Sequence, residues 1–462
     1  FRNNCLGELI FPLSIPFMER RDVLAVIGAI LCLTPSLYVT TKLSNELMIG
    51  LFYRSLIGII ALISSIIFIP KIAVYTERKG LYGKDLGKRY MPLLKDIHVP
   101  EALGIVSSIT FLVCIILCQV IFANSIEEKA NYNSALTSIC FMVLLGFMDD
   151  VLDLPWRAKL FLPTIASFPL LTTYTGSTSI MVPIPLRTLL ASPAENIKEM
   201  STLTPLGVLL DHLPTVVVDR MASGAILELG IFYLVYMSML SVFCTNAINI
   251  YAGINGLEAG QAYVIGCGIL YYGLLQIYLQ SEDLEQYYFA ITLVIPFLGT
   301  SLGLLWHNWF PSKVFVGDTF CYFAGMTFAV IGIHGHFTKP LLLFFLPQVA
   351  NFIYSVPQLF KIVPCPRHRL PQVDEKSLNG MLMIPSTFKC KPEQYKIFKL
   401  IHFLPLDNEE IPNFTVINLI LRMLGPTSER NLCIVLLILQ ACTCFFAIFI
   451  RYSSIASYLF DG

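Results

Sequence analysis

Long apolar stretches separated by short polar segments run along most of the chain. Each approaches or exceeds the length at which an α-helix crosses about 30 Å of hydrocarbon, and internal prolines are tolerated where neighbouring helices satisfy the freed backbone groups. The stretches are residues 22–41, 47–70, 101–123, 134–148, 159–174, 224–245, 259–278, 288–306, 319–334, 340–361 and 431–450. The pattern predicts an all-α polytopic membrane protein, a bundle of about 10 or 11 transmembrane helices.

The composition agrees with this pattern. Of the 462 residues, 56% are hydrophobic and 13% are charged, whereas a soluble protein carries about 25% charged residues. The mean hydropathy is +0.70. The formal net charge is +0, so nothing indicates a nucleic acid as a partner. The 13 cysteines include no CxxC pair, and neither a zinc site nor a disulfide framework is expected.

The basic residues divide unevenly between alternate loops, and this division predicts the orientation. One set of loops carries 21 Lys and Arg residues and the opposite set carries 7. By the positive-inside rule, the richer set faces the cytosol. Every charged or amide-rich motif lies in that set, so we expect the active-site loops on the cytosolic side. The set comprises residues 1–21, 71–100, 149–158, 246–258, 307–318 and 364–430.

The same pattern divides the chain into consecutive parts. The N-terminal apolar segment is a signal anchor, an additional span or a cleaved signal, because two arginines precede it. The parts are an N-terminal cytosolic segment (1–21), the extra apolar segment (22–46), a transmembrane catalytic bundle (47–363) with a lumenal loop (175–223), a cytosolic loop (364–430), and the last transmembrane helix with a lumenal tail (431–462).

Charge gathers where the apolar stretch 134–148 ends, in the sequence DDVLDLPWRAK. Asp149 and Asp150 come directly after the stretch, and Lys159 follows them. Carboxylates at membrane depth usually face a cavity or an ion. Adjacent carboxylates beside a lysine suit a divalent cation together with phosphate. A solvated loop at the membrane interface is the alternative.

The segment TNAINIYAGING, residues 245–256, is rich in amides. Asn246 and Asn249 lie one helical turn apart, and the glycines that follow allow the backbone to approach a ligand closely. Amide oxygens ligate Mg²⁺, and amide groups can read a nucleotide base. We expect Asn246 to contact the sugar or phosphate of a substrate, unless the segment is an ordinary turn between two helices.

Two further loops carry candidate residues. Asp318 follows an aromatic and β-branched run in FVGD and would be unremarkable alone. In PCPRHRLP the prolines favour an extended chain, which places Arg367 and Arg369 on one side and His368 on the other. Two adjacent guanidinium groups suit phosphate or a phosphorylated sugar, although an anionic lipid surface would also attract them.

Four motifs resemble the signature loops of the polyprenyl-phosphate sugar-1-phosphate transferases, of the glycosyltransferase 4 type. They are DDVLDLPWRAKL, TNAINIYAGINGLEAGQ, VFVGDTFCYFAGM and PQLFKIVPCPRHRLP. The motif PCPRHR resembles the corresponding loop in the eukaryotic branch of this family. The resemblance implies transfer of GlcNAc-1-phosphate from UDP-GlcNAc to dolichyl phosphate at the cytosolic face of the endoplasmic reticulum, giving GlcNAc-diphosphodolichol and UMP. This is the first step of dolichol-linked oligosaccharide synthesis for N-glycosylation, and its enzymes are the target of tunicamycin.

The resemblance also implies roles for individual residues. Mg²⁺ would be held by Asn249 and Asp318, and uracil would be read by Asn255. Asp149 and Asp150 match an essential acidic pair. The other positions are Lys159 as a phosphate contact, Leu86 and Glu101 in the nucleotide pocket, and Arg367, His368 and Arg369 in a loop over GlcNAc.

Several alternatives stay open. A transferase for another UDP-sugar, and a polytopic transporter or lipid scramblase, fit the same composition. Glu101 follows a proline and would otherwise be a charge in the first turn of a helix. We prefer direct attack by the lipid phosphate, with Asp149 and Asp150 orienting the acceptor or cation, over a covalent aspartyl-phosphate. The expected partners are UDP-GlcNAc, dolichyl phosphate, membrane lipids of the endoplasmic reticulum and a second copy in a homodimer.

Overall fold

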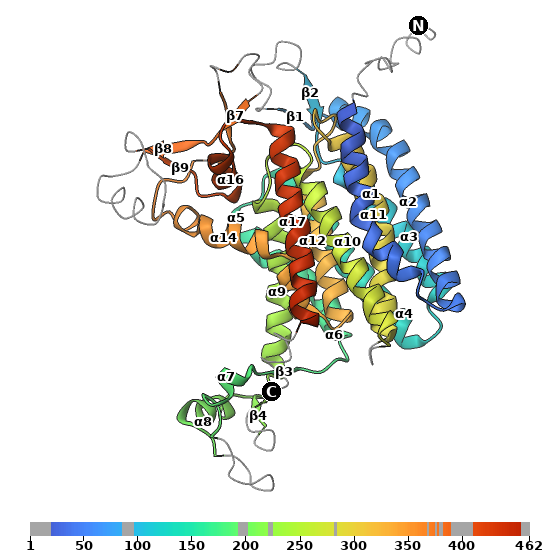
Figure 1. Cartoon of the computed structure of the whole chain (residues 1–462), viewed down its shortest axis with the longest axis vertical. Coiled ribbons are helices and arrows are strands. Elements are labelled where there is room, and N and C mark those ends of the chain that lie inside the picture. Colours follow the sequence, from blue (N-terminus) through green and yellow to red (C-terminus); the bar gives the residue numbers. More distant parts are fainter. Residues whose placement is uncertain are drawn as a thin grey trace.

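The protein is an elongated helical bundle with small sheets at its two ends (Figure 1). Its structure is a computed structural model in which side chains are described from residue 27 onward. The described residues are 20–85, 97–192, 202–219, 225–280, 284–366, 369–374, 377, 382–389 and 410–453.

Each apolar stretch identified in the sequence forms helix over most of its described length. Two stretches are each divided into a pair of helices, α5 with α6 and α13 with α14. The bundle helices are α1 (Arg20–Thr40), α2 (Asn45–Arg78), α3 (Gly104–Phe122), α4 (Ile126–Leu152), α5 (Trp156–Ala166), α6 (Phe168–Thr172), α9 (Ile231–Ile250), α10 (Leu257–Tyr278), α11 (Leu284–Asn308), α12 (Gly317–His334), α13 (Thr338–Phe344), α14 (Leu346–Leu359) and α17 (Glu429–Tyr452).

The predicted all-α polytopic membrane fold is confirmed. Among the described helices, six are long and apolar enough to cross a membrane, namely α2, α3, α4, α9, α11 and α17. The pair α13 and α14, bent by 68°, makes a seventh span if it is counted as one. The remaining apolar stretches form helices that are shorter or carry more polar residues, so fewer than 10 helices meet this criterion.

Helix α12 lies near the centre of the bundle and fixes the position of Asp318. Every residue of α12 from Thr319 to His334 is buried, and the helix contacts α3, α4, α9 and α11. A helix enclosed on all sides carries apolar and small residues all round, as the α12 sequence CYFAGMTFAVIG does. Asp318 lies in its first turn and is therefore held at one end of the bundle.

Two glycines allow α4 and the start of α12 to touch. A Cβ at Gly146 of α4 would lie 2.6 Å from Cα of Thr319. Gly317 has a φ of +74°, a conformation that favours glycine, and a Cβ there would collide with the carboxylate of Asp150. The carboxylates at the end of α4 therefore reach the N-terminus of α12.

The described parts of the loops predicted to face the cytosol gather at one end of the bundle, at the top of Figure 1. All the strand pairs there are antiparallel. The elements are the pair β1 (Tyr82–Lys84) and β2 (His98–Pro100), the sheet β10-β7-β6 (Thr427–Ser428, Leu382–Ile384, Gln372–Val373), the pair β8 (Thr387–Lys389) and β9 (Glu410–Pro412), and the helix α16 (Val416–Leu424).

The opposite end carries a small folded unit, which lies mostly within the predicted lumenal loop 175–223 (Figure 1). Its own apolar core includes Val182, Val218 and Leu227. The unit is built from the antiparallel sheet β3-β5-β4 (Ser179–Met181, Ile226–Glu228, Val217–Val218) and two short helices, α7 (Ile184–Arg187) and α8 (Pro205–Asp211).

Replacing Gly146 with alanine is expected to lower thermal stability by about 1–3 kcal/mol, because the new Cβ would force α4 away from the α12 backbone. Gly28→Ala is the matched control, since no atom lies within 4 Å of a Cβ built there. Thermal unfolding of the detergent-purified protein can be followed with a thiol-reactive dye, which reports exposure of the buried cysteines. Equal midpoints for the two variants would contradict the close contact.

Candidate active site

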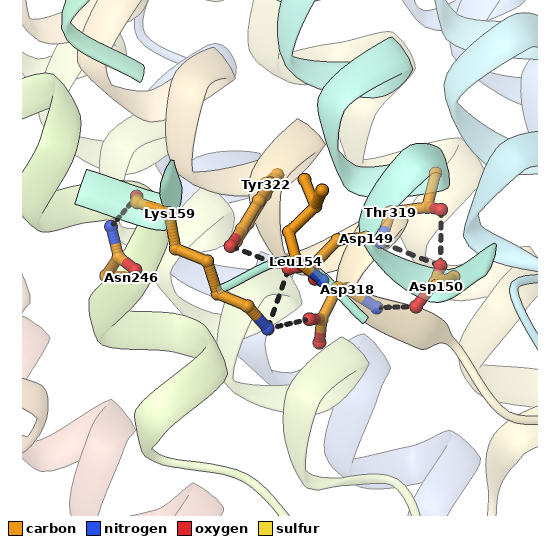
Figure 2. A network of polar contacts seen from close by, with 8 residues as sticks. All are labelled: Asp149, Asp150, Leu154, Lys159, Asn246, Asp318, Thr319 and Tyr322. Carbon is orange, nitrogen blue, oxygen red and sulfur yellow. Dashed lines mark hydrogen bonds and ion pairs between the residues drawn. The ribbon is translucent and has the colours of Figure 1, made fainter. Parts of the chain in front are cut away.

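Asp150 caps the N-terminus of α12 from the neighbouring helix α4. Its Oδ1 accepts a hydrogen bond from the backbone N–H of Asp318 at 2.6 Å (Figure 2). Its Oδ2 accepts from the backbone N–H of Thr319 at 3.1 Å and from the Thr319 hydroxyl at 2.5 Å. Val316, in the N-cap position, provides no side-chain cap. The first N–H groups of a helix need an acceptor and favour negative charge, so both carboxylate oxygens of Asp150 stabilise the start of α12.

Lys159 joins the two other carboxylates. Its Nζ lies 2.8 Å from Oδ2 of Asp149 and 3.2 Å from Oδ2 of Asp318 (Figure 2). Asp149 also accepts hydrogen bonds from the backbone N–H of Leu154 at 2.9 Å and from the hydroxyl of Tyr322 at 3.0 Å. The Asp149 side chain is fully buried, whereas 27% of the Asp318 side chain is exposed. Of these two carboxylates, Asp318 is the one that a ligand can reach.

Asn246 lies beside this network and contacts backbone carbonyls. Its Nδ2 donates to the carbonyl of Val242 at 2.9 Å. The same Nδ2 donates to the carbonyl of Lys159 at 3.3 Å (Figure 2). The amide therefore ties α9 to α5 at the residue that carries the ammonium group. A contact of Asn246 with substrate sugar or phosphate stays a prediction.

A cavity of about 740 Å³ adjoins the network and brings together segments that are far apart in the sequence. Asp318 belongs to both the network and the cavity wall. Most of the described lining residues come from the ranges 84–85, 249–258, 308–318, 370–373 and 383–387, and Glu101 lines the cavity as well. Its charged and candidate amide residues are Lys84, Asp85, Glu101, Asn249, Asn255, Glu258, Asp318 and Glu429.

Asn255 is held by polar partners, Asp85 and Glu429, whose pairing with it the sequence did not predict. Its Nδ2 donates to Oδ2 of Asp85 at 3.0 Å, and its backbone N–H donates to Oε1 of Glu429 at 2.7 Å. Its Oδ1 accepts from the backbone N–H of Ser312 at 2.9 Å. Asp85 and Glu429 both line the cavity. The sequence indicated a role for them only through their position in the loops predicted to face the cytosol. Recognition of uracil by Asn255 stays a prediction.

Glu101 lines the cavity and lies outside any helix, so the alternative role in a first helical turn is wrong. The N–H of Glu101 pairs with the carbonyl of Leu81 at 3.1 Å, Ala102 then turns the chain with a φ of +61°, and α3 begins only at Gly104. Burial, and then the negative charge of Asp150, raise the pKa of the Glu101 carboxyl above its ordinary value.

The arginine loop runs along the cavity in its described part. The carbonyl of Arg369 accepts a hydrogen bond from Nδ2 of Asn418 at 2.9 Å, and the next residue, Leu370, lines the cavity. Within the described part of the chain, Nη1 of Arg369 is buried without a hydrogen-bond partner. Such a donor is expected to bind a ligand or water. The predicted site residues that lie outside the described residues are Leu86, Arg367 and His368.

Asn249 and Asp318 face the same cavity from different helices. A carboxylate and an amide oxygen are ligands that suit Mg²⁺. Across the described ranges, no group of three or more His, Cys, Asp or Glu side chains is placed to hold a metal. Mg²⁺ commonly binds through one or two carboxylates and completes its shell with water and substrate phosphates. The residues present therefore fit a Mg²⁺ that binds together with a diphosphate.

Comparison with known proteins identifies the family. Residues 132–336 match the model of glycosyl transferase family 4. The chain is 43% identical over 394 residues to the UDP-N-acetylglucosamine–dolichyl-phosphate N-acetylglucosaminephosphotransferase of Dictyostelium discoideum, covering 81% of this chain and 83% of that protein. The chain belongs to glycosyl transferase family 4. Another family member, the enzyme of the same name in Saccharomyces cerevisiae, is 38% identical over 86% of this chain and 90% of its own.

A relative of lower identity matches a smaller part of the chain. The phospho-N-acetylmuramoyl-pentapeptide-transferase of Streptococcus thermophilus is 24% identical over 290 residues, which is 60% of this chain and 70% of that protein. The family resemblance predicted from the motifs is thus confirmed by relatives that extend over most of the chain.

Asp150→Ala is expected to lower the thermal midpoint, because the first turn of α12 loses its cap at a cost of about 0.5–2 kcal/mol. Asp318→Ala is the comparison, since it removes one of two carboxylates that share Lys159 and leaves the cap in place. It should change the midpoint little. Thermal unfolding of the ligand-free variants measures both effects, and a larger loss for Asp318→Ala would contradict the assignment.

Glu101→Gln is expected to raise the thermal midpoint at pH 7 and to leave it unchanged at about pH 4 or below. The pKa of Glu101 is raised in the folded state, so the folded state holds this proton more tightly than the unfolded state. The wild-type protein therefore loses stability as the pH rises from the unfolded pKa through the folded pKa. Below the unfolded pKa of about 4.3, both states are protonated and the advantage of glutamine disappears. Midpoints measured from pH 4 to pH 8 test this, and a stabilisation independent of pH would contradict it.

Proposed function

We propose that the protein transfers GlcNAc-1-phosphate from UDP-GlcNAc to dolichyl phosphate, giving GlcNAc-diphosphodolichol and UMP. This is the activity in the names of its relatives from Dictyostelium and yeast. The observation that carries the proposal is the single cavity in which Asp318, Asn249 and Asn255 meet. Its dimensions and oxygen-rich wall suit a nucleotide diphosphate bound with a cation.

The charge of the cavity supports the proposal that a cation binds with the donor. Five carboxyl groups line it, and Lys84 is the single basic side chain among the described lining residues. A diphosphate entering such a wall meets like charge unless positive charge arrives with it. Asp318 and Asn249 would hold Mg²⁺, which would supply that positive charge and stabilise UMP as the leaving group.

The carboxyl and amide groups away from Asp318 suit the uncharged parts of the donor. Hydrogen bonds can be donated by the hydroxyl groups of ribose and GlcNAc and by the imide N–H of uracil. Carboxylates are strong acceptors of such hydrogen bonds. Asp85, Asn255 and Glu429 form one such group on the cavity wall. Arg369 precedes the lining residue Leu370, and we propose that its Nη1, which has no hydrogen-bond partner among the described residues, binds an oxygen of the sugar phosphate.

The contacts of Asp149 and Asp150 support direct transfer between the two substrates. The Asp149 side chain is fully buried and accepts from three donor groups. Both carboxylate oxygens of Asp150 accept hydrogen bonds from α12. Neither carboxylate is free to attack phosphorus. The acceptor needs no strong base, because a phosphate monoester with a second pKa near 6 is largely dianionic at neutral pH. We therefore infer attack by the lipid phosphate, with Lys159 placed to offset its charge.

We further propose that the cavity faces the cytosol in the endoplasmic reticulum membrane and that the protein is a homodimer inhibited by tunicamycin. The basic-rich loops and the cavity-lining segments lie at the same end of the bundle, which supports this orientation (Figure 1). The lipid acceptor would approach Lys159 from the side of the bundle formed by α5 and α9.

The purified protein is expected to release UMP from UDP-GlcNAc only when Mg²⁺ and dolichyl phosphate are both present. Equal amounts of a lipid-linked GlcNAc diphosphate should form, as measured by mass spectrometry. UDP-GalNAc and UDP-MurNAc-pentapeptide serve as alternative donors and should be used poorly. Asp318→Ala should lose activity by at least about a hundredfold, because it removes a ligand of the cation.

Two results would contradict the proposal. Release of UMP without the lipid acceptor would indicate hydrolysis. Exchange of intact UDP-GlcNAc across liposomes, with no UMP formed, would indicate a transporter.

A further inference from the structure

One side of α14 carries four buried polar side chains that take no part in the network of Figure 2. They recur at helical spacing, three or four residues apart. On the other side of α14, Ile353 is 63% exposed. A helix that meets lipid turns its apolar side outward and its polar side toward the protein. The four residues are Gln348, Asn351, Ser355 and Gln358.

The first half of this side holds the end of α9, where Asn249 is located. Nδ2 of Asn351 donates to the carbonyl of Ile250 at 3.2 Å. Nε2 of Gln348 donates to Oε1 of Gln261 at 2.7 Å, and Gln261 in turn donates to the carbonyl of Tyr251 at 2.7 Å. The backbone on the C-terminal side of Asn249 is therefore fixed by α14.

The second half holds the segment that precedes α16. Oε1 of Gln358 accepts from the backbone N–H of Phe414 at 2.8 Å, and its Nε2 donates to Oδ1 of Asn413 at 2.7 Å. The hydroxyl of Ser355 donates to the carbonyl of Phe414 at 2.6 Å. Oδ1 of Asn351 accepts from the backbone N–H of Val416 at 2.9 Å. One residue, Asn351, thus contacts both α9 and this segment.

Two asparagines carry the connection on to the cavity wall. Nδ2 of Asn413 donates to the hydroxyl of Ser386 at 2.8 Å, and both residues line the cavity. Oδ1 of Asn418 accepts from the backbone N–H of Ser386 at 3.0 Å, and its Nδ2 donates to the carbonyl of Arg369 at 2.9 Å. Both asparagines are buried. The loop at 369–373 and the turn at 386 are therefore held together at one wall.

We propose that these residues, which we call the α14 amide network (Asn351, Ser355, Gln358, Asn413 and Asn418), position the two walls of the donor cavity relative to each other. One wall carries Asn249 and the other carries the loop that contains Arg369. A fully hydrogen-bonded buried network specifies a single geometry, and small misplacements of binding groups strongly weaken function. The residues of the network are positioning residues, and the inference rests on the proposed function.

The network should affect the donor and not the acceptor. Its hydrogen bonds run to α9, to the segment at 413–418 and to the wall at 369–386. Lys159, which we place beside the lipid phosphate, is held instead by Asp149, Asp318 and Asn246. Loosening the network should therefore change the KM for UDP-GlcNAc while the KM for dolichyl phosphate stays the same.

Asn418→Ala and Gln358→Met are expected to raise the KM for UDP-GlcNAc by about tenfold and to leave the KM for dolichyl phosphate within about twofold. Ser355→Ala removes a single hydroxyl and keeps the test available if the larger changes prevent folding; it should raise the donor KM by about threefold. Gln276→Met is the matched control, because Gln276 is a buried glutamine that donates to the hydroxyl of Tyr272 within α10, outside the cavity wall. It should change neither KM.

Equal changes in both KM values, or no change in any folded variant, would overturn the positioning role. Equilibrium binding of radiolabelled UDP-GlcNAc to the same variants is the second measurement, and the affinity should fall by the same factor as the donor KM rises. If the wild-type protein binds UDP-GlcNAc but forms no lipid-linked product, the proposed function fails. Weaker binding by the network variants alone would still support the positioning role.

Discussion

The carboxylate of Asp150 on the first turn of α12 is the interaction on which the site depends. The start of a helix presents unpaired N–H groups and a positive dipole, and α12 has no side-chain cap from its own Val316. Asp150 supplies the cap from α4, and Gly146 lets the two helices come close enough for it to do so. The position of Asp318 at the cavity follows from that contact.

Of the three carboxylates in this network, Asp149, Asp150 and Asp318, one can contact a ligand. Asp150 is satisfied by backbone and hydroxyl donors of α12. Lys159 is shared between Asp149 and Asp318, but Asp149 also has two further donors and no exposed surface. Asp318 has Lys159 as a partner, but its side chain is partly exposed at the cavity wall. This is the carboxylate at which we propose that a cation binds, with the amide of Asn249 as an additional ligand.

Much of this arrangement could be predicted from the sequence, because apolar length and motif chemistry are local signals. Apolar length predicted the helices, and the family resemblance of the motifs implied that Asn249 and Asp318, which line the same cavity, would lie at one site. These signals could not show that Asp150 caps a helix 168 positions away, or that Asp85 and Glu429 bind Asn255, since these contacts depend on packing. The polar side of α14 was readable as a helical repeat in PQVANFIYSVPQL, but its partners come from separate segments.

The most direct test of this account is Mn²⁺ binding, measured by electron paramagnetic resonance on the purified protein with and without UDP-GlcNAc. Mn²⁺ is a spectroscopic substitute that accepts the same oxygen ligands as Mg²⁺. The account predicts tight binding only when UDP-GlcNAc is present, and its loss in Asp318→Asn. Tight binding without the nucleotide sugar, or undiminished donor-dependent binding in Asp318→Asn, would contradict it.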